Sequence, residues 1–221
     1  MRACGAAGVM LAAMLLAAAY PAGAAESPAG PEPDVVLDWA FLKRGPSGAP
    51  VRVEFAERVV IARGDLFKIY LEPVTRTTYV YLLLEDAGGG LELLFPERFE
   101  TFTGRGYAGT PFTLPPGEDW FALDGTSGVE RFHLVASSRR LQQLEASVTA
   151  LGKADAAGLA AARRRVLDDL AALRRQNSKL TDVAEKPVAI GGSMRGSKTL
   201  EELATRIEAV TFYTRTFRLE H

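Results

Sequence analysis

The sequence predicts an α+β fold: a mainly antiparallel β-sandwich with a helical-hairpin insertion and a C-terminal strand that returns to the sheet. Short apolar segments over 34–137 alternate with polar residues and are separated by Gly- and Pro-rich turns. Apolar spacing becomes helical over 138–181, and β-forming residues return over 187–221. We therefore expect residues 34–221 to form a single domain.

Residues 1–25 have the pattern of a secretory signal peptide. Arg2 precedes an apolar run, Gly8–Ala19, and the small residues Ala22-Gly23-Ala24 follow. We expect cleavage after this triplet or one residue later, which predicts a periplasmic or secreted protein. The apolar run is short for a bilayer span, and an uncleaved anchor is the alternative.

Composition narrows the class of the mature protein. Cys4 is the only cysteine and precedes the apolar run, so the mature chain lacks disulfides and depends on an ordinary core. Lys and Arg number 26 against 27 Asp and Glu, which does not favour nucleic-acid binding. No second long apolar stretch follows, so we expect no transmembrane segment after cleavage. Residues 26–33 are Pro-rich and predict a flexible lead-in.

Alternating or continuous apolar patterns predict the strands of the middle region. The continuous run Tyr79–Leu84 indicates a strand that is buried on both faces, and the turn Asp86–Gly90 makes the next strand its hairpin partner. The expected strands cover residues 35–42, 51–55, 67–71, 79–84, 91–95, 111–114, 120–123 and 129–136.

The helical region predicts two helices. Leu141 and Leu151 belong to the apolar face of the first, and Gly152 is expected to end it in a left-handed cap. Leu159 to Leu180 follow the same spacing in the second. We expect its arginines to form a solvated, ion-paired face together with its aspartates; they are Arg163, Arg164, Arg165, Arg174 and Arg175, with Asp168 and Asp169.

The last segment begins with a short apolar run and a glycine-rich turn, "VAIGGSMRGSKTL". Gly191 and Gly196 have the spacing of a phosphate-binding loop, but Ser197 displaces Lys198 by one residue, and only about 20 residues remain for further βα units. We therefore expect a connection to a short helix, "LEELATRIEA", capped by Thr199 or Ser197. The stretch "VTFYTRTFRLEH" predicts the final strand.

A set of strings between residues 60 and 138 resembles the bacterial domain-of-unknown-function family numbered 4384. Their order and spacing carry the resemblance, which covers about 40% of the chain. The residues concerned are Gly64, Asp65, Tyr79, Tyr81, Asp86, Phe95, Pro96, Pro115, Gly128 and Glu130.

The resemblance implies an exported or surface protein that serves as an accessory or interaction module. Members also occur fused to protein kinases or peptidases, which carry the chemistry, whereas this chain has no such partner domain. Its helical hairpin and final strand extend beyond the recognised part.

The residues of the resemblance have structural explanations. Tyr79 and Tyr81 are expected on one face of a strand, and Pro96 and Pro115 end strands. Gly128 permits a turn. Glu130 and Arg131 are expected to form an ion pair.

Catalytic or metal-binding constellations are weak in this sequence. His133 and His221 are the only histidines, which is too few for a zinc site, and we expect His133 on the less buried face of its strand. A triad of Ser127, His133 and Asp124 would need all three side chains to come from one turn and strand, and this geometry argues against such a triad. Glu118 and Asp119, with Asp124, flank Trp120 and Phe121 and are more typical of a solvated loop than of a glycosidase. A calcium site on the Asp/Gly loops is a slightly better alternative, although no ligand spacing supports it.

The sequence therefore predicts an exported, non-catalytic binding protein without a cofactor, whose partner is another protein of the cell envelope. The alternative is a ligand carrier or enzyme with a pocket between the sheet and the helices.

Overall fold

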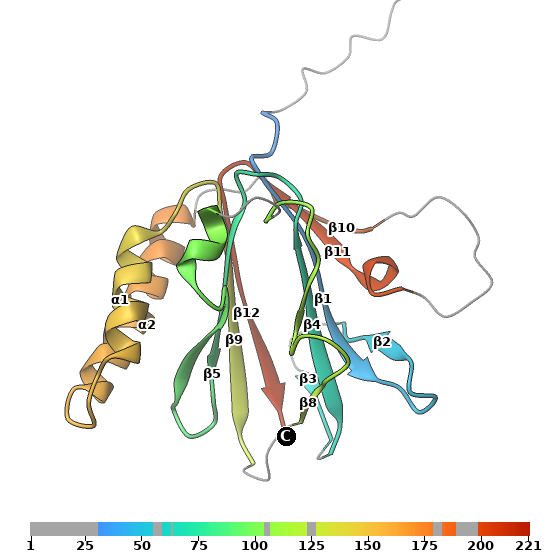
Figure 1. Ribbon diagram of the computed structural model, residues 1–221, viewed down its shortest axis with the longest axis horizontal. Coiled ribbons are helices and arrows are strands. Elements are labelled where there is room, and N and C mark those ends of the chain that lie inside the picture. The colour runs from blue at the N-terminus through green and yellow to red at the C-terminus, as the bar shows by residue number, and fades with distance from the viewer. Residues whose placement is uncertain are drawn as a thin grey trace, which may run out of the picture. The chain divides into compact units, whose positions relative to one another are not determined.

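A computed structural model describes residues 31–54, 59–62, 64–103, 107–122, 127–178, 183–188 and 199–221. Pro31–His221 form one compact unit. The described residues form two largely antiparallel sheets, with two helices beside one of them (Figure 1), which confirms the predicted α+β sandwich class. The expected signal peptide lies outside the described residues.

Sheet A is the larger of the two sheets. Its main order is β10-β11-β1-β4-β7. In addition, β2 pairs with β1 and β8 pairs with β4. Its strands are β1 (Val35–Arg44), β2 (Pro50–Arg52), β4 (Leu66–Pro73), β7 (Phe112–Leu114), β8 (Phe121–Ala122), β10 (Val183–Pro187) and β11 (Thr205–Ala209).

Sheet B has the order β3-β12-β9-β5-β6, antiparallel except for the short parallel contact of β3 with β12. Its strands are β3 (Val59–Val60), β5 (Tyr79–Glu85), β6 (Leu91–Phe95), β9 (Val129–Ser137) and β12 (Phe212–Glu220). The hairpin between β5 and β6 confirms the turn predicted at Asp86–Gly90.

Helices α1 (Gln142–Gly152) and α2 (Leu159–Asn177) lie against the face of sheet B that points away from sheet A (Figure 1). A short helix, η1 (Phe99–Thr103), lies near them. In sequence the helices fall between β9 and β12, which are nevertheless paired neighbours in sheet B. The predicted insertion is thus confirmed, and it also contains β10 and β11, which join sheet A.

Strand alternation places the apolar core between the sheets. Phe41 of β1 stacks on Phe67 at 5.0 Å between ring centroids and meets Phe132 of sheet B edge-on at 5.5 Å. The opposite face of β5 is covered by the helices. This double cover explains why β5 has a continuous apolar run, as predicted.

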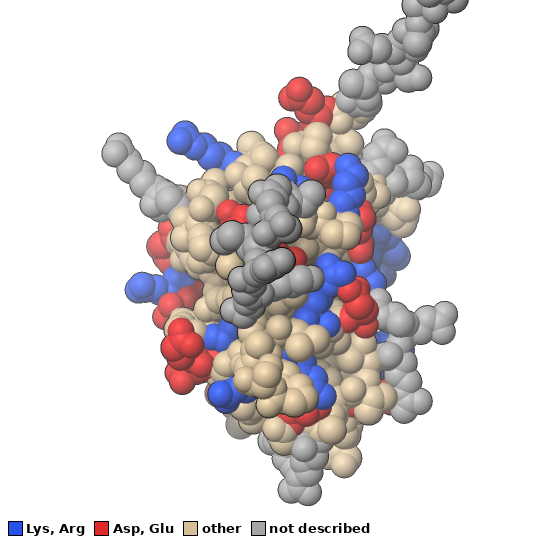
Figure 2. Space-filling model, turned by 90° about the vertical axis from the view of Figure 1, so that its right-hand side faces the viewer, with Lys and Arg blue, Asp and Glu red and all other residues tan. Residues whose placement is uncertain are grey.

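The outer face of sheet A carries a small apolar cluster, which includes Leu42, Tyr70 and Leu203, and buried or exposed ion pairs beside it. Asp38 is buried and accepts hydrogen bonds from Arg206 Nε at 2.7 Å and Nη2 at 2.6 Å, and Lys186 pairs with Glu208 at 2.9 Å. Figure 2, seen from the sheet A side, shows acidic and basic side chains interspersed. The described side chains that are visible on this face form no large surface of one sign.

The expected helix at residues 200–209 is wrong. Only Glu201–Leu203 form one 3-10 turn, η2, whereas β11 is a strand paired with β1. Ile207 and Ala209 alternate with charged residues, and burial of that face outweighs the helix-forming composition. The residue at the start of η2 is Leu200, which makes no side-chain cap. Thr199, just before it, exchanges two hydrogen bonds with Glu202: its N–H donates to Glu202 Oε2 at 2.8 Å, and its hydroxyl accepts from the Glu202 N–H at 3.4 Å.

Two further boundaries differ from expectation. The strand expected from residue 187 onward ends there instead, since β10 covers Val183–Pro187. Gly152 ends α1 without a left-handed conformation, and the capping N–H groups belong to Lys153 and Ala154. The glycine-rich turn with Gly191, Gly196 and Lys198 lies outside the described residues.

Candidate functional site

Gly64 and Asp65 of the family resemblance build a turn before β4. Gly64 has φ +87°, a left-handed conformation that favours glycine. Asp65 Oδ2 accepts the Ala62 N–H at 2.9 Å and pairs with Lys43 at 2.5 Å. Phe95 and Leu114 are the last residues of β6 and β7, so Pro96 and Pro115 follow strand ends as predicted.

Tyr79 and Tyr81 lie on the helix-facing side of β5. The Tyr81 hydroxyl donates to Glu145 Oε1 of α1 at 2.6 Å and accepts the Leu141 N–H at 2.9 Å. Burial, followed by the bond to Glu145, raises the pKa of the Tyr81 phenol. Tyr79 packs edge-on against Phe102 at 5.3 Å. This side of β5 therefore anchors the helical hairpin to sheet B.

Asp86, Gly128 and Glu130 hold the opposite end of sheet B. Asp86 Oδ1 accepts the Gly90 N–H at 2.7 Å. A Cβ on Gly128 would lie 2.3 Å from Ala87 Cβ, so close approach rather than an unusual φ requires glycine there. The expected Glu130–Arg131 pair is wrong, because neighbouring strand residues point to opposite faces. Glu130 instead pairs with His221 at 3.2 Å, and Arg131 with Glu85 at 3.3 Å.

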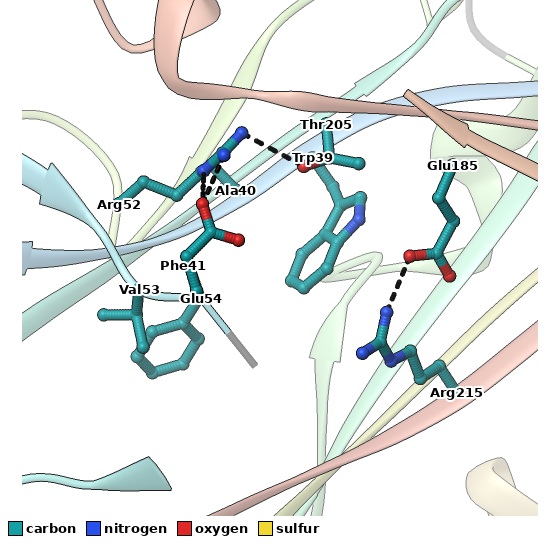
Figure 3. A pocket seen from close by; sticks show the side chains of 9 residues that line it. All are labelled: Trp39, Ala40, Phe41, Arg52, Val53, Glu54, Glu185, Thr205 and Arg215. Atoms are coloured by element: carbon teal, nitrogen blue, oxygen red, sulfur yellow. Dashed lines mark hydrogen bonds and ion pairs between the residues drawn. The ribbon is translucent and has the colours of Figure 1, made fainter. Parts of the chain in front are cut away.

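A cavity of about 160 Å³ lies at the open edge of the sandwich, where β10 and β11 of sheet A face β12 of sheet B. Trp39 of β1 lies at its centre, with Thr205 beside it (Figure 3). Trp39 of β1 and Thr205 of β11 are register partners, so both side chains lie on the inner face of sheet A. Seven of the nine lining residues thus belong to strands, while Val53 and Glu54 follow the end of β2.

Two ion pairs flank Trp39 on opposite sides (Figure 3). On one side the Arg52 guanidinium pairs with Glu54, and its Nη1 lies 3.5 Å from Thr205 Oγ1. On the other side Arg215 of β12 donates to Glu185 of β10 at 2.7 Å. Each cation lining the cavity is therefore neutralised by a neighbouring carboxylate.

Glu185 also links the edges of the two sheets. Its Oε1 accepts the Tyr213 hydroxyl at 2.9 Å, while its Oε2 accepts from Arg215. Burial, followed by the charge of Glu185, raises the pKa of Tyr213. The carboxylate of Glu185 on β10 thus binds two side chains of β12 across the opening between the sheets.

The volume and charge of this cavity restrict what it can bind. A cavity of about 150 Å³ holds one benzene ring, whereas pockets for small-molecule ligands begin at about 300 Å³. A charged group would compete with an existing ion pair. The cavity therefore has room for one uncharged group of about the size of a ring.

A second polar cluster lies between sheet B and α2. His133 of β9 is 4% exposed, which corrects its expected place on a less buried face, since the helices cover that face. Its Nε2 lies 3.3 Å from Glu85 Oε2, and its Nδ1 lies 2.9 Å from Arg174 Nη2. Arg174 also donates to Thr216 of β12. This cluster ties one strand face to α2.

The arginines of α2 do not form one solvated face, contrary to expectation. Arg174 points to the sheet, and Asp169 is buried and accepts from Gln143 of α1 at 2.6 Å. Arg164, Arg165 and Asp168 are exposed, as expected. Helical spacing shows which residues share a face, but α2 has two covered sides, one against α1 and one against the sheet.

A larger cavity, of about 320 Å³, lies beside the C-terminal end of α2. Leu173, Gln176 and Asn177 line it from the helix, and Ser137 and Phe212 line it from sheet B. Its place matches the pocket between sheet and helices that the alternative hypothesis requires.

In the part of the chain that the structure describes, no three His, Cys, Asp or Glu side chains gather as a metal site would need. Asp124 lies outside that part, so the structure does not describe the Ser127–His133–Asp124 arrangement. Glu118 and Asp119 are exposed, in keeping with a solvated loop.

Fold and site together define a β-sandwich protein with a helical hairpin and a side-chain-sized cavity at its open edge. Residues 60–140 match the family described as "Domain of unknown function (DUF4384)", which confirms the resemblance. Comparisons with curated proteins and with solved structures find no match. The matched segment contains Tyr81 and His133, whereas Trp39, Arg52, Glu185 and Arg215 all lie outside it.

Sequence reasoning did not find the edge cavity. Its residues come from separate segments of the chain, and none belongs to a recognised motif. The one usable signal was strand parity, which puts Trp39 inside the sandwich. The strand that carries Glu185 was not predicted, so its partner Arg215 could not be placed opposite a carboxylate.

Proposed function

We propose that this protein is exported to the bacterial cell envelope, periplasmic or released, and acts there by binding another envelope protein without catalysis. The signal-peptide pattern of residues 1–25 supports export. The family segment supports an accessory role. None of the helices in the described ranges has the length and apolar character needed to cross a membrane.

The edge cavity carries the proposal for binding. It is lined mainly by strand residues and is about the size of one side chain, well below an ordinary small-molecule pocket. A partner segment lying along the open edge of the sandwich inserts one uncharged side chain beside Trp39. Such a buried anchor, with a polar rim around it, is the usual arrangement of a binding hot spot.

The absence of catalysis rests on His133. Both of its ring nitrogens are engaged, one by Glu85 and one by Arg174 and Thr216, and the ring is buried under α2. A general acid or base has to reach its substrate. This imidazole instead serves the packing of α2.

A cavity-filling substitution tests the proposal. Thr205→Phe places a ring beside Trp39, and Thr113→Phe makes the same change on the outer face of sheet A, away from the cavity. Tagged variants are cross-linked in the native host and purified, and their partners are identified by mass spectrometry. We expect one dominant envelope partner with the wild type and with Thr113→Phe, reduced at least tenfold with Thr205→Phe at unchanged thermal stability. Equal recovery from both variants would contradict the proposal.

A ligand carrier is the second candidate, and the 320 Å³ cavity beside α2 favours it because its volume reaches the range of ligand pockets. Native mass spectrometry of protein purified from the host envelope tests this function. A small molecule of constant mass that is lost in Leu173→Trp and retained in Thr205→Phe would assign the function to the cavity beside α2. Ligand-free protein in both variants and in the wild type would argue against it.

A further inference from the structure

The hydrogen bonds around His133 define its protonation state. Arg174 Nη2 can only donate, so the Nδ1 atom that faces it at 2.9 Å must accept. The proton of the neutral ring is then on Nε2, which donates to Glu85 Oε2 at 3.3 Å. Arg174 also donates to Thr216, so α2 is bound to β9 and β12 through one guanidinium.

A proton added at Nδ1 would affect these contacts unequally. Glu85 still accepts from Nε2, and Thr216 Oγ1, at 3.1 Å from Nδ1, can accept the new N–H. Arg174 has no acceptor to offer and carries a like charge. Protonation therefore leaves the contacts within sheet B intact and opposes only the contact to α2.

We propose that His133 and Arg174 form an acid-sensitive latch, in which protonation of His133 releases the C-terminal turns of α2 from sheet B and opens the cavity beside them. The released turns carry Leu173, Gln176 and Asn177, which form one wall of the 320 Å³ cavity. Val166 and Leu170, buried in the core, keep the N-terminal part of α2 in place. The latch does not depend on the edge cavity or on its proposed partner.

The charges around His133 favour release of α2 when the imidazole is protonated, because the closed form cannot compensate the added positive charge. Glu85 comes from β5, Arg131 from β9 and Arg174 from α2, while Arg218 of β12, the register partner of Arg131, is exposed. One carboxylate thus faces two guanidinium groups, Arg131 and Arg174, before the imidazole gains a charge. Arg131 shares that carboxylate with His133, so Glu85 cannot compensate both cations fully.

The acid–base behaviour of the ring agrees with this geometry. Burial, and then the charge of Arg174, lower the pKa of His133 below its usual range, while Glu85 opposes the shift. Release of α2 removes the first two causes, so the open form binds the proton more tightly than the closed form. By linkage, each pH unit below the pKa of the open form raises the open population by up to about tenfold, until the closed form is protonated too.

Hydrogen exchange of α2 at pH 7 and pH 5 tests the latch, with rates corrected for the intrinsic pH dependence of exchange. We expect exchange of the amides of 171–177 to rise several-fold or more at pH 5 in the wild type, while those of 163–169 change little. His133→Gln offers an amide oxygen to Arg174 and an amide N–H to Glu85 but binds no proton, so its α2 should respond to pH at least threefold less. Arg174→Gln should exchange fast at both pH values.

Two results would overturn the proposal: protection of 171–177 that is equal at pH 7 and pH 5 in the wild type, or an acid response that persists in His133→Gln. Should either variant fail to fold, NMR titration of the wild-type imidazoles decides, with His221→Gln identifying the two signals. We expect His133 to titrate together with chemical-shift changes in residues 171–177. Titration of His133 without any change in α2 would refute the latch.

Discussion

The Tyr81 hydroxyl donates a 2.6 Å hydrogen bond to Glu145 Oε1, which joins sheet B to α1 across 64 residues of sequence. Arg140 binds the same carboxylate, through Nη2 at 2.5 Å and Nε at 3.0 Å. The inserted hairpin is therefore attached to the segment that matches the family by a buried, fully paired acidic group.

Tyr81→Phe should destabilise the protein by about 1–3 kcal/mol, because the buried Leu141 N–H loses its acceptor and Glu145 loses a donor. Tyr79→Phe is the matched control, since Phe keeps the ring that packs against Phe102, and it should change the free energy of unfolding by less than about 0.5 kcal/mol. Urea denaturation measures both. Equal effects of the two substitutions would show that the Tyr81 hydroxyl does not hold the hairpin.

Two glycine-to-alanine changes should have opposite signs. Gly128→Ala forces its Cβ against Ala87 at 2.3 Å, and we expect a loss of about 1–3 kcal/mol. Gly152→Ala meets no atom within 4 Å at the end of α1 and should stabilise by about 0.5–1 kcal/mol. Thermal unfolding measures both. A neutral Gly128→Ala would mean that the turn at Ala87 can move aside.

Much of the fold followed from local patterns, because alternation and helical spacing both report which residues share a buried face. The pattern was misread at Thr205–Ala209, where Glu208 and Ala209 continue the helix-forming composition of the preceding residues but pairing with β1 makes a strand. For His133 the predicted strand face was correct, but the predicted exposure was wrong. Alternation along a strand cannot tell which face of a sheet the helices will cover. The edge cavity depends on contacts between distant segments, so no local pattern contains it.

Removing Arg206 from the buried Asp38–Arg206 pair should lower the free energy of unfolding more than neutralising Asp38 does. Arg206→Ala leaves Asp38, 2% exposed, as an unpaired buried charge, and we expect a loss of about 3–5 kcal/mol. Asp38→Asn leaves a guanidinium that is 37% exposed and can turn to water, so about 1–3 kcal/mol should be lost. Chemical denaturation at pH 7 compares them. A larger loss from Asp38→Asn would contradict the burial asymmetry.

The free energy of unfolding should depend on pH through the titration of His133. Its pKa in the folded state lies below the value of about 6.5 expected when unfolded, so the unfolded chain binds the proton more readily. Stability contributed by the neutral ring is then complete above that unfolded pKa and is lost as pH falls below it. The slope reaches at most about 1.4 kcal/mol per pH unit and ends at the folded pKa.

The wild type and His133→Gln should therefore diverge below about pH 6.5 when urea unfolding is followed from pH 8 to pH 5. His221→Gln is the control for the second histidine of the chain. Parallel curves for the wild type and His133→Gln would show that the imidazole binds its proton equally in the folded and unfolded states, which would contradict the lowered pKa of His133.

Contact-resolved cross-linking tests the central claim, that a partner binds at the edge cavity, most directly. Glu54 is at the cavity rim with a side chain 73% exposed, so a photoreactive amino acid can replace it. Irradiation in the native host should join the protein to one envelope partner, through a peptide that carries an uncharged aromatic or aliphatic side chain. The same probe at Val60, which is 66% exposed, should not capture that partner. No partner at position 54, or the same partner at both positions, would contradict binding at the edge cavity.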